Sequence, residues 1–218
     1  MKKQSIANWV VIALAISPLV YLYFSWQSIP EKFVMRFEFN QAIEKIQSRN
    51  SLLIATIVLS VVSVSLYLLM RNLKSFDPKV KEETPKSSFN KLGLSITIFL
   101  TILNFSIVQT AISGWIINAN VGSAFFGALI IVIGNYMNNL KPNYLAGIRL
   151  PWTLNDPENW RRTHQLAGKL WFTAGILLII ISFLLPKTIL IPTMFVLLAL
   201  IVLIPGIYSY RIYRNKLS

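Results

Sequence analysis

Residues 52–70 read LLIATIVLSVVSVSLYLLM, and this stretch decides the fold class. It contains no charged residue, and Arg49 and Arg71 flank it. An α-helix rises about 1.5 Å per residue, so a run of this length crosses the roughly 30 Å of hydrocarbon in a membrane. Backbone groups in lipid must find hydrogen-bond partners within their own segment. We therefore predict a transmembrane helix here.

Five further apolar runs of similar length lie on either side of this one. The charged residues fall between the runs, except Lys169, which lies one turn inside the fifth and can extend its ammonium group to the interface. Met1-Lys2-Lys3 resembles the start of a signal peptide, but no small-residue cleavage site follows, so we expect an uncleaved first helix. We predict an all-α, polytopic helical membrane protein with six transmembrane helices. The six predicted segments are Ile6–Phe24, Leu52–Met70, Leu92–Ile112, Val121–Met137, Leu166–Leu185 and Ile189–Tyr210.

The composition agrees with lipid as the solvent. Of the 218 residues, 55% are hydrophobic and 13% are charged, whereas a soluble domain has about 25% charged residues. The net charge of +13 would suggest nucleic acid in a soluble protein. Here the cations cluster between apolar runs, so we expect no nucleic-acid partner. The absence of cysteine excludes disulfides, thiolate metal sites and cysteine nucleophiles.

The positions of Lys and Arg predict the orientation in the membrane. When the loops are assigned alternately to the two sides, all but five of the 21 Lys and Arg residues fall on one side. Cytoplasmic loops carry such an excess. We therefore predict a multi-pass inner-membrane protein with both termini in the cytoplasm. The five cations on the outer side are Lys32, Arg36, Lys45, Arg49 and Lys187.

The loops divide the chain into three parts. Residues 1–70 form an N-terminal two-helix unit, in which residues 25–50 are an outside loop of mixed character. Residues 71–91 contain Pro78, Pro85 and many charges, which is typical of a flexible cytoplasmic linker. Residues 92–218 form a four-helix membrane unit.

The most informative stretch is residues 134–168, GNYMNNLKPNYLAGIRLPWTLNDPENWRRTHQLAG. Pro151 restricts the residue before it to extended backbone. Thr153 or Asn155 is then placed to cap a short helix, with Pro157 near its first turn. Gly147 and Pro151 also limit the backbone conformation of the loop. We predict that this stretch forms an ordered re-entrant or interfacial cap.

Arg149 is the first candidate for a functional residue in this stretch. Its guanidinium group can bind a carboxylate or phosphate through two parallel hydrogen bonds and can stack on Trp152. The alternative is a simple positive-inside anchor beside the lipid headgroups. Trp152 and Trp160 are either part of a binding surface or members of the interfacial aromatic belt.

His164 is the single histidine of the chain. One histidine cannot build a multi-histidine metal site or a bis-histidine haem site. It is either a polar residue at the start of a helix or a proton switch. The apolar runs contain no Asp or Glu, and the chain has no Walker motif and no metal-ligand cluster. We therefore expect no catalytic residue, no metal and no cofactor, and a protein that is not an enzyme.

Five amide side chains lie in or near the third and fourth apolar runs. They either form hydrogen bonds between helices or line a polar path through the bundle. These residues are Asn104, Gln109, Asn118, Asn120 and Asn135.

Residues 134–168 resemble the signature of the SdpI-like family of bacterial immunity proteins. The order and spacing G-I-R-x-P-W-T, then W, then T-H-x-x-x-G carry the resemblance. Residues 29–37 resemble, more weakly, a domain of unknown function that often precedes this signature. The matching positions that we take as the candidate functional motif are Asn135, Asn143, Gly147, Arg149, Pro151, Trp152, Thr153, Trp160, His164 and Gly168.

The resemblance implies a non-enzymatic membrane protein that gives resistance to a secreted, membrane-active peptide toxin and takes part in signalling. Its expected partners are the lipid bilayer, the toxin peptide outside and a cytoplasmic regulator inside. Two alternatives remain open. One is a small transporter or channel for a solute or lipid, and the other is a membrane enzyme that acts on lipid headgroups through Arg149 and His164.

Overall fold

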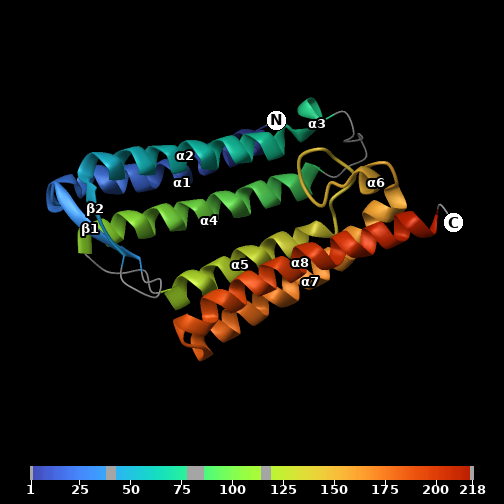
Figure 1. Ribbon diagram of the computed structural model, residues 1–218. Helices are drawn as coiled ribbons and strands as arrows, with labels where there is room; N and C mark the ends of the chain where they lie inside the picture. Colours follow the sequence, from blue (N-terminus) through green and yellow to red (C-terminus); the bar gives the residue numbers. More distant parts are fainter. Residues whose placement is uncertain (1, 38–42, 78–85, 114–118, 217–218) are drawn as a thin grey trace. The chain divides into compact units, whose positions relative to one another are not determined.

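Long apolar helices dominate the computed structural model, which describes residues 2–37, 43–77, 86–113 and 119–216 (Figure 1). Within those residues, 5 helices are long and apolar enough to cross a membrane, and α1 (Lys2–Phe24) contains a shorter apolar stretch, Asn8–Phe24. The prediction of a helical, multi-pass membrane protein is confirmed, and α1 corresponds to the first predicted span. The 5 long helices are α2 (Arg49–Arg71), α4 (Lys86–Ser113), α5 (Ala119–Met137), α7 (Pro157–Leu184) and α8 (Lys187–Asn215).

The chain folds into two compact units. The N-terminal unit comprises Met1–Met70 and Gly93–Ala119, and the C-terminal unit comprises Arg71–Leu92 and Asn120–Ser218. The sequence-based division grouped residues 92–218 together, whereas in the structure most of α4 belongs with α1 and α2. The packing of α4 against α1 and α2 places it in the N-terminal unit. The composition of the loops does not indicate which helices pack together.

An apolar cluster closes one end of the N-terminal unit. It joins the end of α1, the residue after the short helix η1 (Trp26–Ser28), the start of α2 and the end of α4. These segments therefore lie at the same end of the unit (Figure 1). The buried members of the cluster are Leu22, Ile29, Phe33, Leu52, Val108 and Ala111.

A β-hairpin connects α1 to α2. Strand β1 (Lys32–Phe37) pairs antiparallel with β2 (Ile43–Ser48), and Phe33 lies opposite Gln47. The Arg49 amide donates to the carbonyl of Glu31 at 3.0 Å, which continues the pairing to the start of α2. The all-α prediction did not include this hairpin. Its strands are short and rich in charged residues, so apolar alternation is weak.

Polar side chains tie α4 to α1 and α2 within the N-terminal unit. The buried amide of Asn104 donates to the Thr56 carbonyl at 3.1 Å and to the Ser60 hydroxyl at 3.3 Å. The Tyr21 hydroxyl donates to the side-chain oxygen of Gln109. These contacts favour the interpretation of both amides as interhelical bonds. Asn118 lies outside the described residues.

Close helix packing organises the C-terminal unit. A Cβ added to Gly175 on α7 would lie 2.7 Å from the Gly127 carbonyl oxygen on α5, and a Cβ added to Gly168 would lie 3.0 Å from that of Gly134. The backbones of α5 and α7 therefore touch at two places about two turns apart, as small residues allow in membrane helices. We call this contact the glycine seam.

Helix α8 packs against α7 in the same unit, as Figure 1 shows. The Trp171 indole donates to the Ile201 carbonyl at 2.9 Å, and an apolar cluster joins α5, α7 and α8. At the other end of α7, the Asn120 amide of α5 donates to the Leu185 carbonyl at 3.4 Å. Asn120 is thus an interhelical contact as well.

Parts of the predicted linker 71–91 are folded. Leu73–Phe76 forms the short helix α3, and α4 begins at Lys86. Asp77 is 2% exposed, and its carboxylate accepts a hydrogen bond from the backbone N–H of Tyr144. A long-range contact therefore orders this described part of the linker, which its polar composition does not predict. Residues 78–85 lie outside the described residues.

Candidate functional site

Asn143 shapes the turn that follows α5. Its side chain is fully buried, and its Oδ1 accepts hydrogen bonds from the backbone N–H groups of Leu145 at 2.9 Å and Ala146 at 2.6 Å. Its Nδ2 donates to the Lys141 carbonyl at 2.8 Å. Asparagine is favoured in such turns because its short side chain can bond its own backbone. Asn143 therefore fixes the direction in which the loop leaves α5.

Gly147 forms a close contact with His164. Its φ is +105°, a conformation that L side chains rarely adopt, and a Cβ here would lie 2.3 Å from His164 Nε2. The next backbone N–H, that of Ile148, donates to the same Nε2 at 3.0 Å. A side chain at position 147 would thus collide with the imidazole. The positive φ agrees with the expectation that Gly147 limits the backbone conformation of the loop, and His164 is its contact.

The hydrogen bonds of His164 fix its tautomer. Because Nε2 accepts from Ile148, the proton is on Nδ1, which donates to the Trp160 carbonyl at 2.8 Å. The imidazole stacks on the Trp160 ring with centroids 3.9 Å apart, and the Trp160 indole donates to the Leu140 carbonyl at 2.8 Å. His164 and Trp160 are each 1% exposed. Of the two interpretations of His164, the geometry favours a polar residue that holds a loop on a helix.

Thr153 holds the short helix α6 (Pro151–Leu154) in place. Leu150, just before it, is extended with ψ of 151°, as expected of a residue that precedes proline. The buried Thr153 hydroxyl accepts from the Leu150 amide at 2.9 Å and donates to the Ile148 carbonyl at 2.8 Å. Thr153 thus connects α6 to the residues that contact His164.

The cap of the following helix is Asp156 rather than Thr153 or Asn155. Its carboxylate accepts from the backbone N–H groups of Glu158 at 3.0 Å and Asn159 at 3.2 Å, and Pro157 occupies the first turn of α7. The sequence Asp-Pro-Glu at 156–158 is typical of a helix start. This local pattern could have identified Asp156 as the N-cap of α7. The Lys216 ammonium also bonds Asp156.

Trp152 anchors α6 to the end of α8. Its indole donates to the Ser209 hydroxyl at 2.9 Å. Its ring stacks on Tyr213, with centroids 5.7 Å apart, and meets the edge of Tyr210 at 5.4 Å. Trp152 is therefore engaged with α8 within the C-terminal unit. Neither Trp152 nor Trp160 needs the membrane interface to explain its position.

A buried polar triad joins α7 to α8 beside Trp152. The Asn159 amide donates to the Ser209 carbonyl at 3.0 Å, and the Asn159 oxygen accepts from the Thr163 hydroxyl at 3.0 Å. All three residues are 0% exposed. Asn159 and Ser209 were not among the predicted site residues. Ser209 lies in an apolar run about 50 residues further along the chain, so only tertiary structure pairs the two.

Arg149 is exposed, and one guanidinium N–H donates to the Tyr144 carbonyl. The contacts of the Trp152 ring are with Tyr210 and Tyr213, whereas the contact of the Arg149 guanidinium is with the Tyr144 carbonyl. Among the residues that the structure describes, the guanidinium contacts no carboxylate. Its other N–H donors are presented at the surface of the loop.

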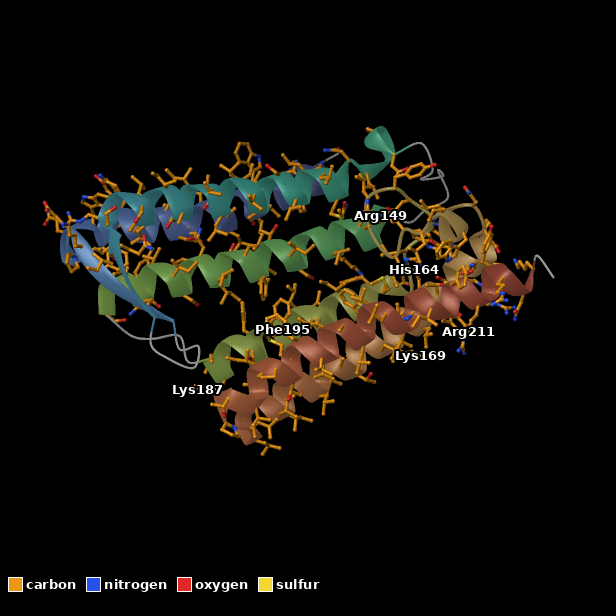
Figure 2. All side chains as sticks on the ribbon, in the orientation of Figure 1. Arg149, His164, Lys169, Lys187, Phe195 and Arg211 are labelled. Atoms are coloured by element: carbon orange, nitrogen blue, oxygen red, sulfur yellow. The ribbon has the colours of Figure 1, made fainter. Side chains whose placement is uncertain are left out.

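Two predicted residues lie apart from this cluster. Gly168 belongs to the glycine seam, where its Cα faces the Gly134 carbonyl. Asn135 is exposed on α5 and lines a groove beside the same seam. The remaining eight predicted residues come together in one ordered cap formed by the loop, α6, the start of α7 and the end of α8. Figure 2 places Arg149 and His164 at one end of the C-terminal unit and Lys187 at the other.

This arrangement can present charge on a fixed backbone. The His164 nitrogens, the Thr153 hydroxyl and the Trp152 and Trp160 indoles are all used in bonds within the chain. Within the described ranges, no group of three or more His, Cys, Asp or Glu residues could hold a metal ion. Hydrogen bonds within the cap therefore hold the backbone that carries the exposed Arg149.

Comparison with known proteins points to one family. Residues 139–209 match the SdpI/YfhL protein family, a range that contains the eight predicted residues of the cap and excludes Asn135, Tyr210 and Tyr213. Over 213 residues the chain is 26% identical to the Immunity protein SdpI of Bacillus subtilis (strain 168), covering 98% of this chain and 97% of that protein. No solved structure matches. The chain therefore resembles the SdpI/YfhL protein family over residues 139–209, and it is similar to one immunity protein along nearly all of its length.

Proposed function

We propose that this protein gives its bacterium resistance to a secreted, membrane-active peptide toxin, without catalysing a reaction. The observation that carries the proposal is the similarity to an immunity protein across 98% of the chain. That similarity includes both compact units, so it covers the hairpin as well as the cap. The protein acts in the cytoplasmic membrane, which it crosses several times.

The proposed orientation has six spans with both termini in the cytoplasm. In the N-terminal unit, the end of α1, the start of α2 and the end of α4 share one apolar cluster, so the three helices alternate in direction. In the C-terminal unit, the start of α5 meets the end of α7 through Asn120 and Leu185. The end of α5 meets the start of α7 through Leu140 and Trp160. This alternation supports the cation count, which assigns the cap to the cytoplasm and the hairpin to the outside.

We propose that the hairpin region, residues 25–49, meets the toxin. It combines short strands with an apolar anchor, because Phe33 is buried against the helices while Ile46 on β2 is 71% exposed. A two-stranded sheet has edges that can pair with an added peptide segment. A toxin that acts on the membrane from outside reaches this end of the protein first.

The cap is the proposed docking site for a cytoplasmic regulator. Hydrogen bonds hold its backbone, so a partner that binds it loses little entropy in ordering it. Arg149 supplies an exposed guanidinium suited to a carboxylate of the partner. The regulator is thus proposed to bind on the side of the membrane opposite to the proposed toxin contact.

Survival of a sensitive bacterium tests the proposed function. Cells that express the protein should survive exposure to its matching peptide, and cells with the empty vector should not. Peptides encoded beside the gene are the first to test. Full sensitivity to every such peptide, at confirmed abundance of the protein in the membrane, would remove the immunity proposal and favour a transporter.

A further inference from the structure

An open groove of about 570 Å³ lies beside the glycine seam in the C-terminal unit. Gly134 and Gly168 line it, at the end of α5 and about three turns inside α7. Asn138, which follows the last residue of α5, lines it. The groove therefore lies where the apolar helix α5 ends.

The polar lining of the groove suits an anion. Its one charged side chain is Lys169, and the lining contains no carboxylate. Asn135, Asn138 and Gln165 add amide N–H donors. The Gln165 oxygen already accepts from Arg161 at 3.3 Å, so the donors of this amide are the part left for a ligand. A cation with several amide donors can hold phosphate oxygens.

An apolar stripe continues from the groove along α7. Phe172 forms the apolar wall of the groove and is 40% exposed. Ile176 is 40% exposed and Ile180 is 51% exposed, and the three residues follow one another at helical spacing of four. A ligand with an anionic group in the groove and an apolar chain along this stripe would match both surfaces. In Figure 2, Lys169 lies on α7 toward the end that carries His164 and away from Lys187.

We propose that this groove binds the phosphate group of an anionic membrane lipid, with an acyl chain along Phe172, Ile176 and Ile180. The Lys169 ammonium pairs with the phosphate, and the amides of Asn135 and Asn138 bond its oxygens. The bound lipid lies beside the two glycines at the end of the seam. This site is separate from the cap and does not depend on the identity of a toxin.

Native mass spectrometry of the purified, full-length protein in neutral detergent tests this proposal. Phosphatidylglycerol is added to wild type, Lys169→Gln and the matched control Lys141→Gln. Lys141 is an exposed lysine of the same unit that does not line the groove. We expect Lys169→Gln to lower the bound fraction about fivefold, as for the loss of one lysine beside anionic lipid. The control should stay within twofold of wild type.

Two further arms identify the source of the phosphate. Phosphatidylcholine, which has no net charge, should bind several times more weakly than phosphatidylglycerol, and millimolar inorganic phosphate should leave the bound phosphatidylglycerol in place. Equal binding of the two lipids would overturn the proposal, as would an equal loss in the Lys141→Gln control. Release of the lipid by inorganic phosphate would assign the groove to free phosphate instead.

Discussion

At the scale of single residues, the loop is held by contacts that leave no room for other side chains. Gly147 supplies a positive φ and a bare Cα, and His164 Nε2 occupies the space beside it. The Ile148 amide bonds the same nitrogen, so the glycine and the histidine each require the other. This pairing explains why the sequence places a glycine and a polar ring 17 positions apart in the same stretch.

Gly147→Ala is expected to destabilise the cap. The new methyl group would collide with His164 Nε2, and the residue would keep a strained backbone, which costs about 1–3 kcal/mol. The measurement is thermal unfolding of the purified protein in detergent. Gly206→Ala is the matched control, because no atom lies within 4 Å of a Cβ there and alanine favours a helix. Equal melting temperatures for Gly147→Ala and wild type would contradict the contact.

Arg149→Ala is expected to abolish protection while the protein stays in the membrane. The guanidinium of Arg149 bonds the Tyr144 carbonyl with one N–H and presents the others to a partner. Lysine cannot make the same bidentate bonds, so Arg149→Lys should fail as well. The measurement is survival under toxin at equal membrane abundance of the variants.

A simple anchor would accept lysine at position 149, because charge alone satisfies the positive-inside rule. Full protection by Arg149→Lys would therefore refute the bidentate role. Lys141→Ala removes an exposed cation of the same loop and should retain protection.

At the scale of elements, the start of α7 combines a helix cap with a link to the end of α8. Asp156 accepts two backbone N–H groups of α7, and its carboxylate is paired with Lys216 at the end of α8. The hydrogen bond from Lys216 lowers the pKa of Asp156 below its ordinary value of 3.8, and burial opposes this only in part. Charge and capping therefore act together at the point where α6, α7 and α8 meet.

The charge of Asp156 should stabilise the protein at neutral pH and not in acid. A carboxylate whose pKa is lowered by folding contributes stability above its unfolded pKa, and the contribution is lost as pH falls through the folded pKa. Asp156→Asn keeps a capping oxygen but removes the charge. Its melting temperature should be lower than that of wild type at pH 7, and the difference should shrink below about pH 4. A difference in melting temperature that is independent of pH would mean that Asp156 stabilises the protein by capping α7 and not through its charge.

At the scale of the whole molecule, successive long helices within each unit run in opposite directions. The positions of Lys and Arg predict which end of the helices faces the cytoplasm. Single-cysteine labelling tests it cleanly, because the chain has no native cysteine. Ser28→Cys lies at the hairpin end of the N-terminal unit and Asn139→Cys at the cap end of the C-terminal unit, both at exposed positions. We expect a membrane-impermeant reagent to label Ser28→Cys in intact cells, and Asn139→Cys only after lysis. Labelling of Asn139→Cys in intact cells would contradict the proposed orientation and indicate the reverse one.

The boundaries of α7 mark what periodicity and hydropathy can predict. The predicted span began at Leu166, whereas the helix begins at Pro157. The first turns carry polar residues such as Asn159 and Thr163, which are buried because they bond each other and α8. Hydropathy treats such residues as solvent-exposed loop, so it cannot find the part of a helix whose polar groups are satisfied by another helix.

The sequence by itself determined that this is a multi-pass helical membrane protein, because long uncharged runs in lipid have few structural alternatives. Local chemistry also determined the extended backbone before Pro151. Tertiary structure alone decided that Gly147 meets His164 and that Trp152 meets Ser209 on α8. It also moved α4 into the N-terminal unit. These pairings join residues that are distant along the chain. They depend on which helix surfaces pack together, and local composition does not indicate this.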